Sequence, residues 1–163
     1  MAAGTSIRTI DGMSAATGLR VAIVVSRYHD FVTDRLQAGA LGALDAAGVP
    51  EANITVVRVP GAFEIPVAAQ HVAASARYDA IVCLGCVIRG ATPHFEYISA
   101  AVSNGLTAAA AATGVPMSFG VLTTNSVEEA LERAGEGKSN KGWEAAVSAV
   151  EMATVIARLR SQQ

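Results

Sequence analysis

The sequence is short of charge for its length. Only 16% of its 163 residues are Asp, Glu, Lys or Arg, and the formal net charge is -2. A chain without a basic excess has no field that attracts phosphate backbones, so we expect no nucleic-acid partner. Hydrophobic residues make up 52% of the chain, a large share for a lone soluble domain. We therefore expect further copies of the chain to cover part of the apolar surface.

Long apolar runs are also absent. No stretch approaches the ~20 unbroken apolar residues of a membrane span, so we expect no membrane segment. Residues 1–18 contain no apolar core of the length found in secretory signals, and they are predicted to form a small, polar, mobile arm. The rest, residues 19–163, is long enough for a single domain with its own core. We expect the protein to be cytoplasmic.

The chain has 2 cysteines, and they form a C-x-x-C motif, Cys83 and Cys86. Such spacing occurs in zinc sites and redox pairs, but here it lies inside the apolar run YDAIVCLGCVI. In a strand, residues three apart point to opposite faces, so the two thiols would diverge. The sequence has no second cysteine pair to complete a zinc site. The motif therefore indicates a buried strand and no metal.

Apolar runs and helical stretches alternate along the chain. Four runs have the continuous apolar, β-branched character of strands covered on both faces: residues 19–25, 54–59, 80–88 and 117–122. Helices are predicted over residues 31–47, 65–76 and 95–113, from a capping box at 126–129, and near 143–159. This order predicts a parallel sheet between two helix layers, joined by right-handed crossovers.

Several residues are typical of helix boundaries. Gly48 and Gly114 are each followed two residues later by a proline, which predicts the ends of the first and third helices. Asp30 is predicted to be the N-cap of the first helix.

Unusual residues follow each predicted strand. The segments SRYHD, PGAFE, RGATPH and TTN come directly after the four apolar runs, and Phe119 lies within the fourth run. In an open α/β sheet, ligands bind outside the carboxyl ends of the strands. Polar and aromatic residues that converge there predict an active or binding site at this edge of the sheet.

The third segment is similar to a phosphate-binding P-loop without its lysine. In GCVIRGATPHFEY, Gly85 and Gly90 have the P-loop spacing and Thr92 supplies the hydroxyl, but Ala91 stands where the lysine belongs. A triphosphate with magnesium is therefore not expected. Backbone N–H groups at a helix start still favour an anion, which indicates a single phosphate. His94 would lie beside that phosphate and could serve as general acid and base.

Most of the candidate residues could also have a purely structural role. Arg89 has no preferred assignment, because its side chain could face either way. The structural alternatives for the others are a core aromatic (Tyr28), a plug on the sheet (Phe63), a carboxylate at a helix N-terminus (Glu64), a first-turn surface residue (His94) and solvated charges (Arg133 and Lys141).

Five motifs together resemble the lumazine synthase family: PGAFEIP, LGCVIRGATPHFEY, GVLTTNS, ERAG and NKG. The resemblance runs from about residue 19 to the end of the chain. It implies a flavodoxin-like fold, a three-layer α/β/α sandwich with a four-stranded parallel sheet. It also implies condensation of 5-amino-6-(D-ribitylamino)uracil with 3,4-dihydroxy-2-butanone 4-phosphate, the penultimate step of riboflavin biosynthesis. The products would be 6,7-dimethyl-8-ribityllumazine, phosphate and water, formed with no metal and no cofactor.

By this resemblance, one subunit would hold the uracil substrate. Tyr28 would stack on the pyrimidine ring, and Glu64 would accept hydrogen bonds from the ribityl hydroxyls. The remaining contacts to the ribityl chain and the uracil edge would come from Ala62 and Phe63 and from the backbone of Cys86, Val87 and Ile88.

The phosphorylated substrate would be held partly by a second subunit. Its phosphate would contact Ala91, Thr92 and Arg133, and His94 would move protons. The family builds pentamers, and in some members twelve pentamers close into an icosahedral shell of sixty subunits. The resemblance also implies riboflavin synthase as a partner. The residues that would come from the neighbouring subunit are Phe119, Arg133 and Lys141.

The chain departs from the family pattern in two places. Tyr28 is followed by His29, where the pattern has Phe or Trp followed by Asn, and Cys86 stands where threonine is common. Two other functions stay open: a flavin- or lumazine-binding protein without catalysis, and a mainly structural shell protein. The phosphate site argues against the first, because such a binder has no need of it.

Overall fold

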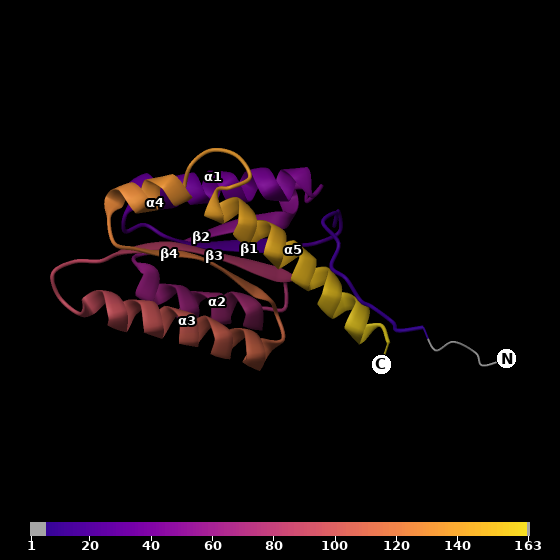
Figure 1. The fold of residues 1–163 in the computed structure, drawn as a ribbon. Helices are drawn as coiled ribbons and strands as arrows, with labels where there is room; N and C mark the ends of the chain where they lie inside the picture. Colours follow the sequence, from indigo (N-terminus) through magenta and orange to yellow (C-terminus); the bar gives the residue numbers. More distant parts are fainter. Residues whose placement is uncertain (1–5, 163) are drawn as a thin grey trace.

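The protein folds around four parallel strands, as a computed structural model that describes residues 6–162 shows (Figure 1). Their order across the sheet is β2-β1-β3-β4. Each strand pairs in parallel with its neighbour, so all carboxyl ends lie at one edge of the sheet. The strands are β1 (Val21–Ser26), β2 (Ile54–Val59), β3 (Ala80–Ile88) and β4 (Met117–Thr124).

Helices cover both faces of this sheet. One layer contains α1 (Asp30–Ala46), α4 (Val127–Arg133) and α5 (Lys141–Arg160), and the other contains α2 (Ile65–Ala74) and α3 (His94–Thr113) (Figure 1). Short 3₁₀ turns precede β2 and α2, at η1 (Glu51–Asn53) and η2 (Ala62–Glu64). The predicted three-layer α/β/α sandwich is therefore confirmed.

The core consists of two apolar clusters, one on each face of the sheet. Side chains alternate between them along β1 and β3, because successive residues of a strand point to opposite faces. Cys86 packs in the cluster under α1 and α5, whereas Cys83 packs in the cluster under α2 and α3. Both thiols are free, and burial raises the pKa of Cys83 to about 12. The divergence predicted for the two cysteines is confirmed.

The prediction that all four strands are covered on both faces is wrong for β2. Thr55, Val56 and Arg58 are exposed, and Val59 is the one fully buried residue of that strand. The reason is position: β2 lies at the edge of the sheet, whereas α1 and α2 pack over β1 and β3. An apolar run of β-branched residues therefore does not distinguish an edge strand from a central one here.

The start of α1 also differs from the prediction, because its N-cap is His29 and not Asp30. His29 has the left-handed backbone conformation, with φ 61° and ψ 47°. The two residues after β1 bond the segment after β2: the Arg27 N–H donates to the Val59 carbonyl at 2.8 Å, and the Tyr28 N–H donates to the Pro60 carbonyl at 3.0 Å. A single left-handed residue then turns the chain into the helix, and Asp30 becomes the first helical residue. Its carboxylate still complements the positive helix end.

The predicted ends of the first and third helices and the predicted start of α4 agree with the structure. Gly48 (φ 81°) and Gly114 (φ 69°) adopt the left-handed conformation after α1 and α3. Ser126 caps α4, since its Oγ accepts from the Glu129 N–H at 3.2 Å. The Glu129 carboxylate accepts from the Asn125 N–H at 2.9 Å, one residue earlier than a capping box requires.

A buried asparagine sets the start of α5. Asn140 is 3% exposed, and its Oδ1 accepts from the N–H groups of Gly142 at 2.8 Å and Trp143 at 3.2 Å. Its Nδ2 donates to the carbonyls of Arg35 at 3.1 Å and Gly135 at 2.8 Å. This cap begins the helix at Lys141, two residues before the predicted start near residue 143.

The chain preceding β1 lies along α5 in its described part. Residues 6–18 form neither helix nor strand. The Met13 N–H donates to Thr154 Oγ1 at 2.8 Å, and Arg158 donates to the Asp11 carbonyl at 2.8 Å. Residues 1–5 of the predicted mobile arm lie outside the described residues. Among the helices of residues 6–162, none has the length and apolar character needed to cross a bilayer.

The crossing of α1 and α5 leaves no room for a side chain at Gly142, where a Cβ atom would collide with the Leu36 carbonyl. We expect Gly142→Ala to destabilise the fold by roughly 3 kcal/mol, because backbone must move to admit the methyl group. Gly18→Ala is the matched control, since nothing lies within 4 Å of a Cβ atom there. Thermal unfolding measures both variants, and equal midpoints would contradict this account of the crossing.

Candidate active site at the carboxyl ends of the strands

A cleft of about 800 Å³ opens at the carboxyl ends of the strands. Its walls are the segments that follow β1, β2 and β3, together with the first turns of α3. The cleft brings together a large part of the predicted site: Tyr28, Ala62, Phe63, Glu64, Cys86, Val87, Ile88, Thr92 and His94.

Two aromatic rings stand at the cleft with little cover. Tyr28 is 68% exposed and Phe63 is 59% exposed, so neither belongs to the apolar core. A large exposed ring in a cleft offers a flat face on which a planar ligand can stack. This geometry favours the binding interpretation of both residues over a role in the core.

The end of β3 forms the floor of the cleft. β3 pairs with β1 only as far as Leu84, but it pairs with β4 as far as Ile88. On the β1 side, the peptide groups of the last residues of β3 therefore lie outside the ladder. Backbone donors and acceptors in that position can read the polar edge of a flat ring. Cys86 and Val87 contribute buried side chains, which leaves their backbone as the polar part.

Glu64 has a structural contact as well as a place in the cleft. One carboxylate oxygen accepts from the Gly61 N–H at 3.0 Å, which holds the η2 turn in shape. This is the helix-end role that was its structural alternative. A carboxylate can accept several hydrogen bonds. The contact with Gly61 therefore orients Glu64, and its carboxylate can still accept hydrogen bonds from the hydroxyls of a ligand.

The loop between β3 and α3 carries the residues that the sequence predicts to bind an anion. His94 is the first residue of α3, and Pro93 is its N-cap. Thr92 and His94 are exposed and line the cleft, whereas Ala91 is exposed in the same loop but does not line it. The first N–H groups of a helix have no partner within the helix, so this end of α3 favours an anion.

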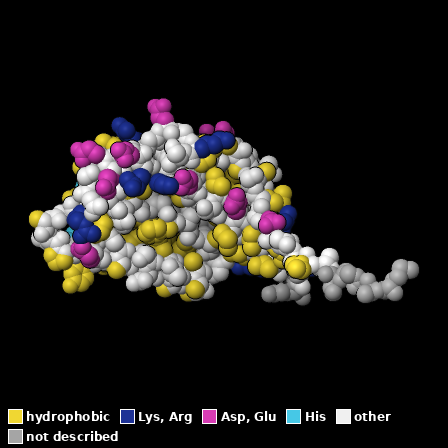
Figure 2. Space-filling view, viewed as in Figure 1, with side chains coloured by type: hydrophobic (Ala, Val, Ile, Leu, Met, Phe, Trp, Pro, Cys, Tyr) yellow, Lys and Arg dark blue, Asp and Glu magenta, His cyan; other side chains and the backbone are white. Residues whose placement is uncertain are grey.

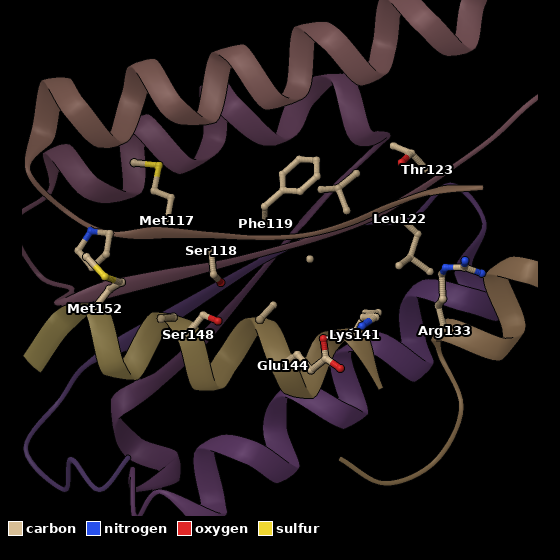
Figure 3. A pocket seen from close by; sticks show the side chains of 15 residues that line it. Met117, Ser118, Phe119, Leu122, Thr123, Arg133, Lys141, Glu144, Ser148 and Met152 are labelled. Carbon is tan, nitrogen blue, oxygen red and sulfur yellow. Dashed lines mark hydrogen bonds and ion pairs between the residues drawn. The ribbon is translucent and has the colours of Figure 1, made fainter. Parts of the chain in front are cut away.

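The other predicted residues lie elsewhere. Phe119, Arg133 and Lys141 line a groove of about 490 Å³ between the outer edge of β4 and α5 (Figure 3). Arg133 and Lys141 lie toward one end of the groove and Met152 toward the other (Figure 3). No residue of the described chain, 6–162, lines both the cleft and the groove. The predicted site residues thus form two separate clusters in one subunit.

Intramolecular contacts hold the two cations of the groove. Arg133 Nη1 donates to the Glu129 carbonyl at 3.0 Å, within its own helix. Lys141 Nζ lies 2.7 Å from Glu144 Oε2 in an exposed ion pair. Phe119 is 50% exposed on the edge strand beside them. A surface with an exposed aromatic ring and two cations is suited to a ligand that has both an aromatic and an anionic part.

Further residues line the cleft beyond those given a binding or catalytic role from the sequence. Of these, His29 has the strongest interactions with a predicted residue: its ring lies 4.4 Å from that of Tyr28 and 5.7 Å from that of Phe31. Burial lowers the pKa of the His29 imidazole. Its position after the first strand was the signal that could have identified it. The others are Gly61, Gly90, Phe95, Ile98 and Val127.

Metal binding has no candidate within the described part of the chain. No group of three or more His, Cys, Asp or Glu residues there could hold an ion.

Comparisons with known proteins agree on one family. A family model described as 6,7-dimethyl-8-ribityllumazine synthase matches residues 18–157. A 6,7-dimethyl-8-ribityllumazine synthase of Syntrophus aciditrophicus (strain SB) is 52% identical over 149 residues, which are 91% of this chain and 97% of that protein. Another, of Desulfatibacillum aliphaticivorans, is 48% identical over 153 residues, 94% of this chain and 99% of that protein.

A solved structure is similar only at the level of a distant fold. The crystal structure of a GDP-L-fucose synthetase from Naegleria fowleri matches 95% of this chain and 48% of that one, at 12% identity. Its TM-score of 0.39 is too low to carry an argument.

The lowered pKa of His29 predicts a pH dependence of stability. As the pH falls through the ordinary histidine value of about 6.5, the unfolded chain binds a proton that the folded ring resists. The free energy of unfolding therefore decreases toward acid. His29→Asn should reduce this decrease, because asparagine also accepts the left-handed conformation and does not titrate. Thermal unfolding between about pH 5 and about pH 8 measures it, and identical slopes for both proteins would contradict the assignment.

Proposed function

The chain belongs to the 6,7-dimethyl-8-ribityllumazine synthase family, and we propose that two neighbouring subunits share its active site. The protein condenses 5-amino-6-(D-ribitylamino)uracil with 3,4-dihydroxy-2-butanone 4-phosphate to 6,7-dimethyl-8-ribityllumazine in riboflavin biosynthesis. The observation behind the proposal is the division of the site residues between the cleft and the groove. A site that needs both clusters has to be completed by a second copy.

The cleft binds the uracil substrate. Tyr28 stacks on the pyrimidine ring, and the unpaired backbone at the end of β3 meets the polar ring edge. The ribityl chain runs along η2, where Glu64 accepts hydrogen bonds from its hydroxyls. Ala62 and Phe63 line this path. The ring amine then points toward the loop that carries His94.

The phosphorylated substrate lies between the cleft and the groove of the next subunit. Ala91 and Thr92 offer backbone N–H groups and one hydroxyl to the phosphate. Arg133 of the neighbouring copy supplies the positive charge that the loop lacks, and Lys141 adds a second cation. Phe119 of that copy covers the stacked pyrimidine ring.

The reaction then requires proton transfers at fixed positions. The substrate amine attacks the ketone and loses water to give an imine, phosphate leaves, and the ring closes with loss of a second water. His94 lies at the phosphate end of the cleft and moves protons in these steps. Much of the rate acceleration comes from holding the two substrates together, since an amine and a ketone react without help.

Exposed apolar surface supports an oligomer, and we propose a pentamer that closes into an icosahedral shell. Residues 98–113 of α3 contain no charged side chain. On the face seen in Figure 2, charged side chains gather over the layer of α1, α4 and α5 and are few over α3. The groove adds Phe119 and Met152, both about half exposed. The short glycine-rich segment GEGKSNKG, which leads from α4 into the first residues of α5, supports the shell, since in this family it accompanies icosahedral closure.

The location and the pathway partner are further proposals. The protein works in the cytoplasm, a reducing compartment that suits its two free cysteines. Riboflavin synthase is its partner, because the product of a penultimate step is the substrate of the last enzyme.

The assembly proposal is tested by the mass of the purified protein. Light scattering should give a mass of at least a pentamer, because the site is incomplete in one subunit. If the shell proposal is also correct, the mass should be that of a hollow shell of sixty subunits. A monomer with full activity would contradict the shared site. A pentamer or decamer would contradict only the shell.

Arg133→Ala should weaken binding of the phosphorylated substrate and leave binding of the uracil substrate nearly unaffected. The guanidinium supplies most of the positive charge at a phosphate site without a P-loop lysine, so its loss should raise the KM for that substrate roughly tenfold or more. Arg133→Lys is the control that keeps the charge but not the two-pronged contact, and it should fall between. Equal loss of affinity for both substrates would show that the assignment is wrong.

His94→Ala should slow turnover by about 10²-fold or less, toward the lower end of what a general acid and base contributes. Both KM values and the particle mass should change little, because the imidazole transfers protons and does not hold the substrates. Lumazine fluorescence after mixing both substrates gives the rates. An unchanged kcat would return His94 to the role of a first-turn surface residue.

A further inference from the structure

Arg89 is the residue that follows β3, and its side chain contacts two other segments, the first turn of α3 and the residue after β4. Its N–H donates to the Thr124 carbonyl at 2.8 Å, which extends the pairing of β3 with β4 by one residue. Its Nε donates to Asn125 Oδ1 at 3.0 Å, and its Nη1 pairs with the Glu96 carboxylate. Its Cζ lies 4.3 Å from the centre of the Phe95 ring.

The contacts of Arg89 on α3 adjoin the proton carrier. Phe95 and Glu96 are the residues directly after His94 in the first turn of that helix, and Phe95 itself lines the cleft. The guanidinium lies against the Phe95 ring and bonds the Glu96 carboxylate, so it holds the first turn from two sides. The direction of that turn sets where the imidazole of His94 lies.

The contact on the other side leads toward the phosphate-binding arginine. The Asn125 N–H donates to Glu129 Oε2 at 2.9 Å, and the Glu129 carbonyl accepts from Arg133 Nη1 at 3.0 Å. Arg89, Asn125, Glu129 and Arg133 are therefore linked in turn by hydrogen bonds, some to side chains and some to backbone groups, from the end of β3 to α4. This series of bonds joins the loop of one cleft to the groove that serves the next one.

We propose that Arg89 is a positioning residue that fixes His94 in its own cleft and Arg133 in the groove presented to the neighbouring subunit. The inference rests on the proposed function, since it assumes the roles given there to those two residues. Arg89 does not touch substrate in this account, because its guanidinium is already engaged by Glu96, Asn125 and the Phe95 ring.

The fold itself depends little on these contacts. The side chains of Arg89 and Glu96 are 44% and 53% exposed, and exposed ion pairs contribute little to stability. The hydrogen bond from Arg89 lowers the pKa of the Glu96 carboxyl, so the pair stays ionised near neutral pH. Removal of the guanidinium should therefore loosen the loop and the first turn of α3 without unfolding the chain.

The test uses Arg89→Met, which keeps an apolar stem and removes all three polar and cation contacts. We expect kcat to fall about tenfold and the KM for the phosphorylated substrate to rise, because small misplacements of catalytic groups are costly. The KM for the uracil, the unfolding midpoint and the particle mass should stay unchanged. Arg58→Met is the matched control, since Arg58 is also an exposed arginine in an ion pair, with Asp34, away from the cleft.

Two further variants separate positioning from direct binding. Glu96→Gln should move the kinetic parameters in the same direction as Arg89→Met. If Arg89 bound the phosphate itself, Glu96→Gln would free the guanidinium and tighten binding, which would overturn the proposal. In an Arg133→Ala background, Arg89→Met should no longer raise the KM for the phosphorylated substrate, because residues that act in series are not additive.

The remaining outcomes are distinct. Unchanged kinetics of Arg89→Met, or a uniform loss of activity together with a lower unfolding midpoint, would overturn this inference while the proposed function stands. The His94→Ala and Arg133→Ala proteins are measured beside it. If neither of those differs from the wild type, the proposed function fails, and the inference built on it fails with it.

Discussion

The unequal length of neighbouring parallel strands is the constraint on which the site depends. β3 has 9 residues and β1 has 6, and their pairing begins at the same level, with Val21 opposite Ala80. The extra length of β3 therefore emerges at the carboxyl end, where it pairs with β4 on one side and, within residues 6–162, with no strand on the other. That uncovered side is the floor of the cleft. The turns that follow β1 and β2 then place Tyr28 and Glu64 around it.

The same sheet underlies the proposal that two subunits share the active site. The cleft opens over the inner strands, whereas the groove lies along the outer edge of β4. An edge strand offers unpaired backbone and exposed side chains, and proteins normally cover such edges. Covering β4 with the cleft of another copy would bring Arg133 to a loop that lacks a lysine. The shared site and the apolar surface are then two consequences of one arrangement.

Local pattern sufficed for most of the fold. The apolar runs, the glycines at 48 and 114 and the cap at Ser126 follow from short-range chemistry, and the structure has them where the sequence predicts them. The edge position of β2 was not predictable from its own residues, since burial depends on neighbours. Nor was the left-handed conformation of His29, which results from the pairing of Tyr28 with the segment after β2.

The site was predictable to a similar extent. Strand ends identified the residues of the cleft, but no local signal separates them from the groove, which depends on sheet order. Arg89 is the clearest case. The residues next to it in the sequence do not determine which way its side chain points. Its contacts with Phe95, Glu96 and Asn125, which only the fold brings next to it, determine that direction.

The most direct test of the shared site is complementation between two impaired subunits. Equal amounts of His94→Ala and Arg133→Ala chains, co-assembled at random, should place both native residues in about one quarter of the sites, because each of two neighbours is correct half the time. At a concentration of the phosphorylated substrate well below its KM, where both parents are slow, activity should exceed that of either parent and approach this fraction of the wild-type rate. Activity equal to the average of the two parents, in oligomers verified to contain both chains, would contradict a site divided between subunits.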